Sequence, residues 1–340
     1  MLELEPRLVH APELFGNYWF NTLQPISLRE NLGNVLLVDF WDYSCINCIR
    51  TLPYVSEWHR RYAGEGLVVV GVHTPEFRFG QERANVEQAI KGFKIRYAVV
   101  ADNEARVWSA FANRYWPTRY LIDKNGYIRF SQHGEGGYQQ FERAIQSLLL
   151  DAGYRGELPD LMEPLRDTDE TGAVCYRSTG EMQAGYLRSS LGNVEGVIAE
   201  SPADFVDPKE YLDERFYVGG RWYVAREYMR HDGPELEPGT VALRYEAFEA
   251  NAVLSSSTGR LIEIEIHQDG KPLAREYAGS DVIVTNEGQS ILFVDKPRMY
   301  QLVKNPLFGG HELTLRSASP GLEVFAFSFV SCAIPDTIGY

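Results

Sequence analysis

The first 150 residues alternate between continuous apolar runs and stretches in which apolar residues recur every three or four positions. Two runs, Val35–Trp41 and Leu67–His73, are apolar almost throughout, which is typical of strands buried on both faces of a parallel sheet. Between them, residues 45–62 carry apolar side chains at three-residue steps, which predicts a helix with one face on the sheet. Similar patterns predict helices over 81–93, 105–113 and 141–150, and strands over 98–101, 120–123 and 127–132. This half is therefore predicted to be an α/β unit, a central mixed sheet flanked by helices.

The pattern changes after residue 152. Residues 153–170 are acidic and show little periodicity, which predicts a linker or a segment that wraps around the first unit. From residue 171 onward, short strand patterns separated by turn residues predict an all-β, jelly-roll-like sandwich domain. Gly219-Gly220 is interpreted as a two-residue hairpin turn within it. We therefore predict a domain over 1–152, a linker over 153–170 and a β-sandwich over 171–340.

Composition narrows the functional classes. A net charge of −14 argues against a nucleic-acid partner and against an anionic membrane surface. No run reaches the roughly 18 apolar residues of a membrane span, and the N-terminus lacks the basic start and apolar core of a signal peptide. As written, the chain is expected to be cytoplasmic. An extracytoplasmic location is the alternative if the sequence is a trimmed part of a longer protein.

Cys45 and Cys48 are the strongest chemical signal in the chain. They open a helix directly after a buried strand, where free N–H groups and the helix dipole stabilise a thiolate at Cys45. Cys48, one helical turn on, can resolve a mixed disulfide formed at Cys45. A zinc site is the alternative for such a pair, but structural zinc needs four ligands and no second ligand pair follows. The pattern favours a redox-active dithiol that needs no cofactor and no metal.

Asp39 lies six residues before Cys45, inside the apolar strand. An acid there is costly unless it has a task, and burial would raise the pKa of its carboxyl into a range suited to proton transfer. Downstream, Trp116-Pro117-Thr118 leads directly into another apolar strand.

Together these residues resemble the thioredoxin superfamily. The resemblance is greatest to the TlpA-like branch and to the soluble C-terminal region of DipZ-type proteins, on motifs at Trp41–Pro53, Tyr115–Asp123 and Gly134–Tyr138. It implies a thioredoxin-like fold followed by a β-sandwich that resembles a carbohydrate-binding module. It further implies that Cys45 is the attacking thiol, Cys48 the resolving thiol, Asp39 the proton-transferring acid and Pro117 a cis-proline facing the thiols.

Aromatic residues near the motif form a second group of candidates. Trp41, Tyr43, Trp116 and Thr118 are predicted to surround the thiols as a docking surface for an extended protein substrate, with simple packing as the alternative. Glu135 could approach the active site, as the resemblance suggests, or be an ordinary charged turn residue.

The second half offers weaker candidates. Cys175 and Cys332 are expected to be buried free thiols, and a structural disulfide between them is the alternative. Aromatic residues at strand spacing could stack sugars, although such residues more often belong to a core. These residues are Trp222, Tyr223, Tyr228, Tyr245 and Tyr300.

The sequence thus predicts a thiol–disulfide oxidoreductase of the kind that serves cell redox homeostasis. The resemblance favours a reductase of protein disulfides, supplied by an upstream electron donor. The alternative is a binding protein whose β-sandwich recognises a glycan or a protein while the thioredoxin-like half is structural. A peroxidase is less favoured, because residues 38–45 lack the P-x-x-x-T/S-x-x-C context of peroxiredoxins.

Overall fold

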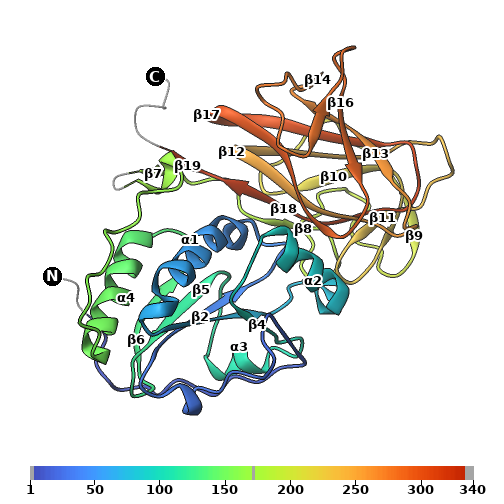
Figure 1. Cartoon of the computed structure of the whole chain (residues 1–340). Coiled ribbons are helices and arrows are strands. Elements are labelled where there is room, and N and C mark those ends of the chain that lie inside the picture. Colours follow the sequence, from blue (N-terminus) through green and yellow to red (C-terminus); the bar gives the residue numbers. More distant parts are fainter. Residues whose placement is uncertain (1–3, 171–172, 334–340) are drawn as a thin grey trace. The chain divides into compact units, whose positions relative to one another are not determined.

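The computed structural model describes residues 4–170 and 173–333, and only the backbone of residues 174, 175, 332 and 333. It divides into two compact units, residues 1–169 and 170–340. Each unit is described by itself below (Figure 1).

The first unit is built on a six-stranded sheet with the order β1-β4-β3-β2-β5-β6. Its strands are β1 (Tyr18–Phe20), β2 (Val35–Trp41), β3 (Leu67–His73), β4 (Ala98–Ala101), β5 (Thr118–Ile122) and β6 (Ile128–His133). The helices are α1 (Ile46–Tyr62), α2 (Arg83–Gly92), α3 (Arg106–Ala110) and α4 (Tyr138–Ala152). The three central strands β2, β3 and β4 are parallel, and β1, β5 and β6 join them antiparallel. The predicted α/β unit with a mixed sheet is confirmed.

Alternation along β2 decides which residues face which helices. Val35, Leu37 and Trp41 belong to a buried cluster with residues of α1, α2 and α4, whereas Leu36 and Phe40 pack on the other face with residues of α3. Because strand side chains alternate between faces, the side chain of residue 39 falls on the face covered by α1 and α4. The strand therefore directs one acid beneath the helix that begins at the cysteine pair.

Residues 154–169 wrap around the first unit, the second of the two alternatives predicted for this segment. The buried carboxylate of Glu142 accepts a hydrogen bond from the N–H of Met162 at 2.7 Å. The hydroxyl of Tyr54 accepts one from the N–H of Leu165, also at 2.7 Å. Backbone donors of the segment are thus satisfied by side chains of α1 and α4.

The second unit consists of strands and contains no α-helix among its described residues. Its main sheet has the order β15-β16-β13-β17-β12-β10-β11-β18-β8, with β9 and β14 paired at its sides and β12 also paired with β18. The strands are β8 (Met182–Gln183), β9 (Pro202–Phe205), β10 (Phe216–Val224), β11 (Met229–His231), β12 (Gly239–Ser256), β13 (Ile262–Gln268), β14 (Lys271–Pro272), β15 (Val282–Val284), β16 (Ser290–Val294), β17 (Arg298–Ser317) and β18 (Leu322–Val330). The β-rich character is confirmed, and jelly-roll topology stays a prediction.

The hairpin predicted at Gly219-Gly220 is wrong, because β10 runs straight through these glycines. Residues up to Gly219 pair with β12, and residues from Gly220 onward pair with β9. Gly220 has φ +93°, a conformation that a side chain disfavours. The glycine pair is therefore the place where one strand changes partners, a role that glycines share with turns.

A separate two-stranded sheet joins β7 (Val174–Cys175) and β19 (Cys332–Ala333), with Cys332 opposite Cys175 in the backbone register. Their side chains lie outside the described set, so both predictions for these thiols stay open.

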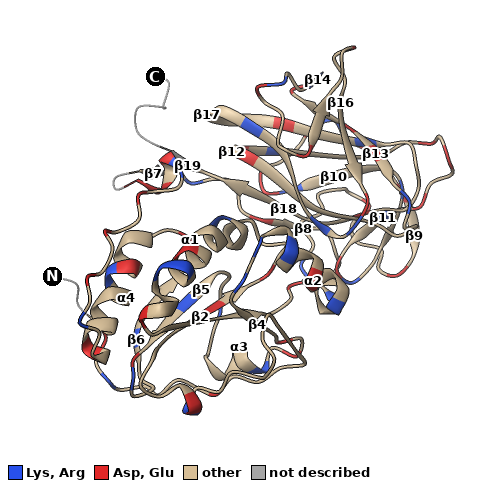
Figure 2. Ribbon diagram, in the orientation of Figure 1, with Lys and Arg blue, Asp and Glu red and all other residues tan. Residues whose placement is uncertain are grey.

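Charged residues of both signs occur on both units (Figure 2).

Candidate active site

Cys45 and Cys48 lie where β2 passes into α1. Cys45 is the N-cap residue of α1, and its Sγ accepts a hydrogen bond from the N–H of Cys48 at 3.3 Å. Both cysteines are free thiols; Cys45 is half-buried and Cys48 is fully buried. An N–H donor aimed at a sulfur favours negative charge on it. The geometry gives one accessible sulfur suited to attack and one sheltered sulfur beside it.

Asp39 is buried on the face of the sheet that α1 covers. Neither of its carboxyl oxygens has a hydrogen-bond partner among the described residues. Burial raises the pKa of Asp39 to about 7, against an opposing attraction from Arg119. Burial, followed by the neighbouring Cys45 sulfur, also raises the pKa of the Cys48 thiol, and the charge of Asp39 contributes. A proton acceptor poised near neutrality therefore lies in electrostatic reach of the thiol that must lose its proton.

Pro117 lies at the start of β5, and the Trp116–Pro117 peptide bond is cis. The indole N–H of Trp116 donates to the carbonyl of Thr74 at 3.0 Å, and its ring stacks on Trp108 with centroids 4.2 Å apart. The carbonyl of Pro117 accepts from the N–H of Gly134 at 2.8 Å. These contacts fix the residues on either side of the cis bond.

The predicted docking surface is largely wrong. Trp41, Tyr43 and Thr118 are buried, so their side chains belong to the core, as the packing alternative held. Trp116 is half-buried. The exposed aromatic next to it is Tyr115, with 60% of its surface accessible, which the sequence analysis did not single out. Continuous apolar strand context could have indicated burial for Trp41, since every residue of β2 is buried.

A buried Asp–His pair behind the cysteine motif was also missed. A carboxylate oxygen of Asp42 lies 3.0 Å from Nε2 of His73 at the end of β3, and the other accepts from the hydroxyl of Ser44 at 2.6 Å. Burial alone would raise the pKa of Asp42, but His73, Ser44 and the N–H of Glu76 together lower it. In the sequence His73 is a lone residue in a strand pattern. Only the register of β2 against β3 brings it to the loop before Cys45.

Glu135 is tied to α1 rather than free in a turn. Its carboxylate accepts from Nε of Arg50 at 2.8 Å. Thr168 of the wrapping segment accepts from the same guanidinium at 3.1 Å. The pair connects the loop between β6 and α4 to the helix that carries the cysteines.

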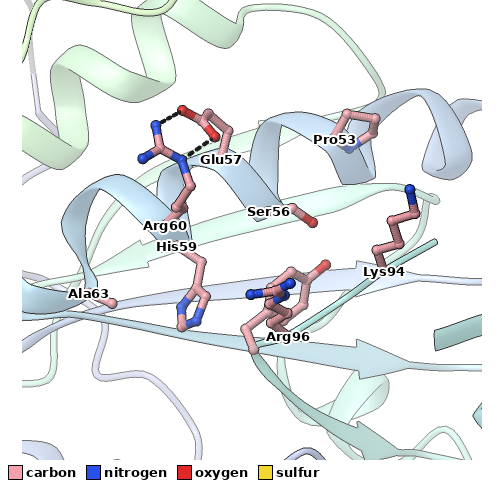
Figure 3. Close-up of a pocket in the computed structure, with 9 residues that line it drawn as sticks. Pro53, Ser56, Glu57, His59, Arg60, Ala63, Lys94 and Arg96 are labelled. Carbon is pink, nitrogen blue, oxygen red and sulfur yellow. Dashed lines mark hydrogen bonds and ion pairs between the residues drawn. The ribbon is translucent and has the colours of Figure 1, made fainter. Parts of the chain in front are cut away.

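A pocket of about 670 Å³ opens on another side of α1 (Figure 3). Residues Pro53, Ser56, Glu57, His59, Arg60 and Ala63 of α1 line it together with Lys94, Arg96 and Tyr97. Arg60 donates to Glu57 across one helical turn (Figure 3). Tyr97, which is fully buried, feels the charges of both Asp39 and Cys48, and these, after burial, raise the pKa of its hydroxyl. The pocket wall therefore reaches toward the buried acid.

The described residues hold no group of three or more His, Cys, Asp and Glu side chains placed to bind a metal ion. Among the helices of the described residues, none combines the length and apolar composition that a membrane crossing requires.

Three of the five aromatic residues proposed to stack sugars are core residues instead. Trp222, Tyr245 and Tyr300 are buried, and each donates a hydrogen bond to a neighbour within the unit. Tyr223 and Tyr228 are half-buried.

Both units match known families. Residues 10–131 match the AhpC/TSA family, and residues 179–329 match a family described as a thioredoxin-like C-terminal domain.

Curated relatives agree with this division. Protein DipZ of Mycobacterium tuberculosis is 33% identical over 322 residues, which cover 94% of this chain and 42% of DipZ. The chain therefore spans less than half of that relative. The thiol-disulfide oxidoreductase YkuV of Bacillus subtilis is 28% identical over 142 residues, 41% of this chain and 94% of YkuV. The thiol-disulfide oxidoreductase ResA of Geobacillus kaustophilus is 27% identical over 121 residues, 36% of this chain and 67% of ResA.

Proposed function

This chain belongs to the thioredoxin-like oxidoreductases of the TlpA and DipZ type, and from that premise we propose that it reduces protein disulfides by cycling Cys45 and Cys48. One observation supports this most strongly. A half-buried Cys45 caps α1 with the N–H of Cys48 on its sulfur, while Cys48 lies buried behind it near Asp39.

The proposed cycle has two exchange steps. The thiolate of Cys45 attacks a substrate disulfide, which forms a mixed disulfide and releases one substrate thiolate. Cys48 then loses its proton to the carboxylate of Asp39 and attacks Sγ of Cys45. The second substrate thiolate leaves and is protonated by solvent, and the Cys45–Cys48 disulfide awaits two electrons from a donor.

Substitution of each thiol tests the order of the steps. Cys48→Ser should accumulate a mixed disulfide with a model disulfide protein, because nothing resolves it. Cys45→Ser should form none. Trapping by acid quench and non-reducing electrophoresis distinguishes the two variants. If both variants turned over like the wild type, the proposal would be wrong.

The direction of electron flow needs its own measurement. The reduction potential, obtained by thiol trapping in graded dithiothreitol buffers, should lie near the ~−270 mV of a reductase. A value near ~−120 mV would mean a disulfide donor instead. Failure of the wild type to cycle would favour the alternative, a protein whose β-rich unit binds a glycan or a protein.

A further inference from the structure

Arg119 is a buried cation on the strand next to Asp39, and neither the sequence motifs nor the cycle above uses it. We propose that Arg119 is a positioning residue that keeps Asp39 ionised, so that Asp39 can take the proton of Cys48. The inference rests on the proposed function, and it concerns the proton step alone.

The sheet register places the two charges together. Asp39 of β2 is the direct partner of Arg119 of β5 in an antiparallel pair. Directly opposite residues in such a pair lie about 4.5–5.5 Å apart at Cα and project from the same face. Arg119 accordingly lies on the face of α1 and α4, where its guanidinium carbon is 5.1 Å from the ring centre of Phe141 and 5.9 Å from that of Trp58.

The position of the guanidinium is held by the loop before α4. Nη2 of Arg119 donates to the carbonyls of Gly134 and Gly136, each at 3.0 Å. The ring of Tyr138 lies 5.2 Å from the guanidinium carbon. These contacts orient the group without neutralising its charge, because carbonyls and ring faces carry no net charge.

The remaining donors of Arg119 indicate that the charge has a task. Its side chain is fully buried, and Nε and Nη1 have no hydrogen-bond partner among the described residues. Burying a cation without a full set of partners is costly, and an apolar residue would suit stability at least as well. The carboxyl of Asp39 is equally unpartnered. The two charges therefore act on one another through a weakly screening interior rather than through a direct ion pair.

Other titratable groups do not supply the same charge. Cys48 of α1, Tyr97 before β4 and Tyr138 of α4 are neutral in their acid forms, and burial is the first cause that raises the pKa of each. Glu135, which also attracts Arg119, is itself paired with Arg50. For Asp39 the causes are burial, which raises its pKa, and Arg119, which lowers it.

The consequence for the proton step follows directly. When Cys48 attacks Sγ of Cys45, its proton passes to Asp39, the bond between Cys45 and the substrate breaks, and the substrate thiolate leaves. Asp39 accepts that proton only as a carboxylate. Without Arg119, burial would leave Asp39 protonated through the neutral range, and resolution of the mixed disulfide would slow.

The test is a direct titration of Asp39 in the reduced full chain. Carbon-13 NMR of protein labelled at aspartate carboxyls follows the titration, and Asp39→Asn identifies the signal. Arg119→Met removes the charge and the donors, whereas Arg119→Gln removes the charge and keeps amide donors for the Gly134 and Gly136 carbonyls. Arg129→Met, which removes a cation from β6 of the same sheet, is the matched control.

We expect both Arg119 variants to raise the titration midpoint of Asp39 by roughly one pH unit or more, the size typical of an opposite charge nearby. Arg129→Met should leave the midpoint unchanged. A midpoint in Arg119→Gln equal to that of the wild type would overturn the inference, even if Arg119→Met failed to fold. Because the titration needs no substrate, failure of disulfide reduction in the wild type would refute the proposed function without affecting this result.

Discussion

At the scale of single residues, the carboxyl of Asp39 has two opposing effects. Its burial gives it a pKa of about 7, near the pH at which a proton acceptor works best. The same burial means that ionising the carboxyl in the folded protein is unfavourable. Proton transfer and stability therefore place contrary demands on this residue.

Asp39→Asn should stabilise the reduced protein in a pH-dependent way. The folded-state pKa lies above the unfolded value, so the wild type loses stability as pH rises from about 4 to about 7 and stays level above that. The variant lacks this loss. We expect it to be more stable by roughly 2–4 kcal/mol at pH 8 and by almost nothing near pH 4, measured by urea unfolding.

A stability difference that did not change with pH would contradict a buried, titrating Asp39. The rate of mixed-disulfide resolution supplies an independent readout. It should rise through pH 7 in the wild type and lose that rise in the variant.

At the scale of elements, the close approach of β3 to its neighbours depends on Gly71. Gly71 is the register partner of Asp39 in β2 and of Val99 in β4. A Cβ there would lie 2.9 Å from Nε1 of Trp41 and 3.1 Å from Cε2 of Tyr97. The missing side chain therefore lets two large rings pack over the sheet beside the buried acid.

Gly71→Ala should destabilise the first unit by about 1–3 kcal/mol, because two buried rings must shift to admit one methyl group. Gly64→Ala is the matched control, since a Cβ at Gly64 meets nothing within 4 Å. Chemical unfolding followed by tryptophan fluorescence measures both. Equal stability of the two variants would show that the rings are not closely packed over Gly71.

At the scale of the whole molecule, the first unit extends beyond its last helix. Residues 154–169 add Met162 to the buried core, satisfy the carboxylate of Glu142, and bring the carbonyl of Asp160 to Arg61 at 2.6 Å. A domain cut at residue 152 would remove all three contributions.

A fragment of residues 1–169 should therefore be more stable than a fragment of residues 1–152, by roughly 2–5 kcal/mol from lost apolar burial and buried hydrogen bonds. Urea unfolding of the two fragments measures the difference. Both contain Cys45 and Cys48, so their reduction potentials serve as a check that the site has formed. Equal stabilities would mean that the wrapping segment contributes nothing to the first unit.

The sequence alone determined the features that depend on local pattern. The strand–turn–helix that presents Cys45 and Cys48, the burial of Asp39, and the bounds of β3 and β4 all follow from neighbouring residues. Such features are local because hydrophobic periodicity and helix capping act over a few positions.

Only the tertiary structure decided the partners of those residues. Arg119 meets Asp39, and His73 meets Asp42, through strand register that joins distant parts of the chain. The burial of Trp41 and Thr118 and the path of β10 through Gly219-Gly220 likewise depend on which strands and helices pack together. A local sequence pattern does not encode that choice, because the same residues are compatible with several pairings until a shared core selects one.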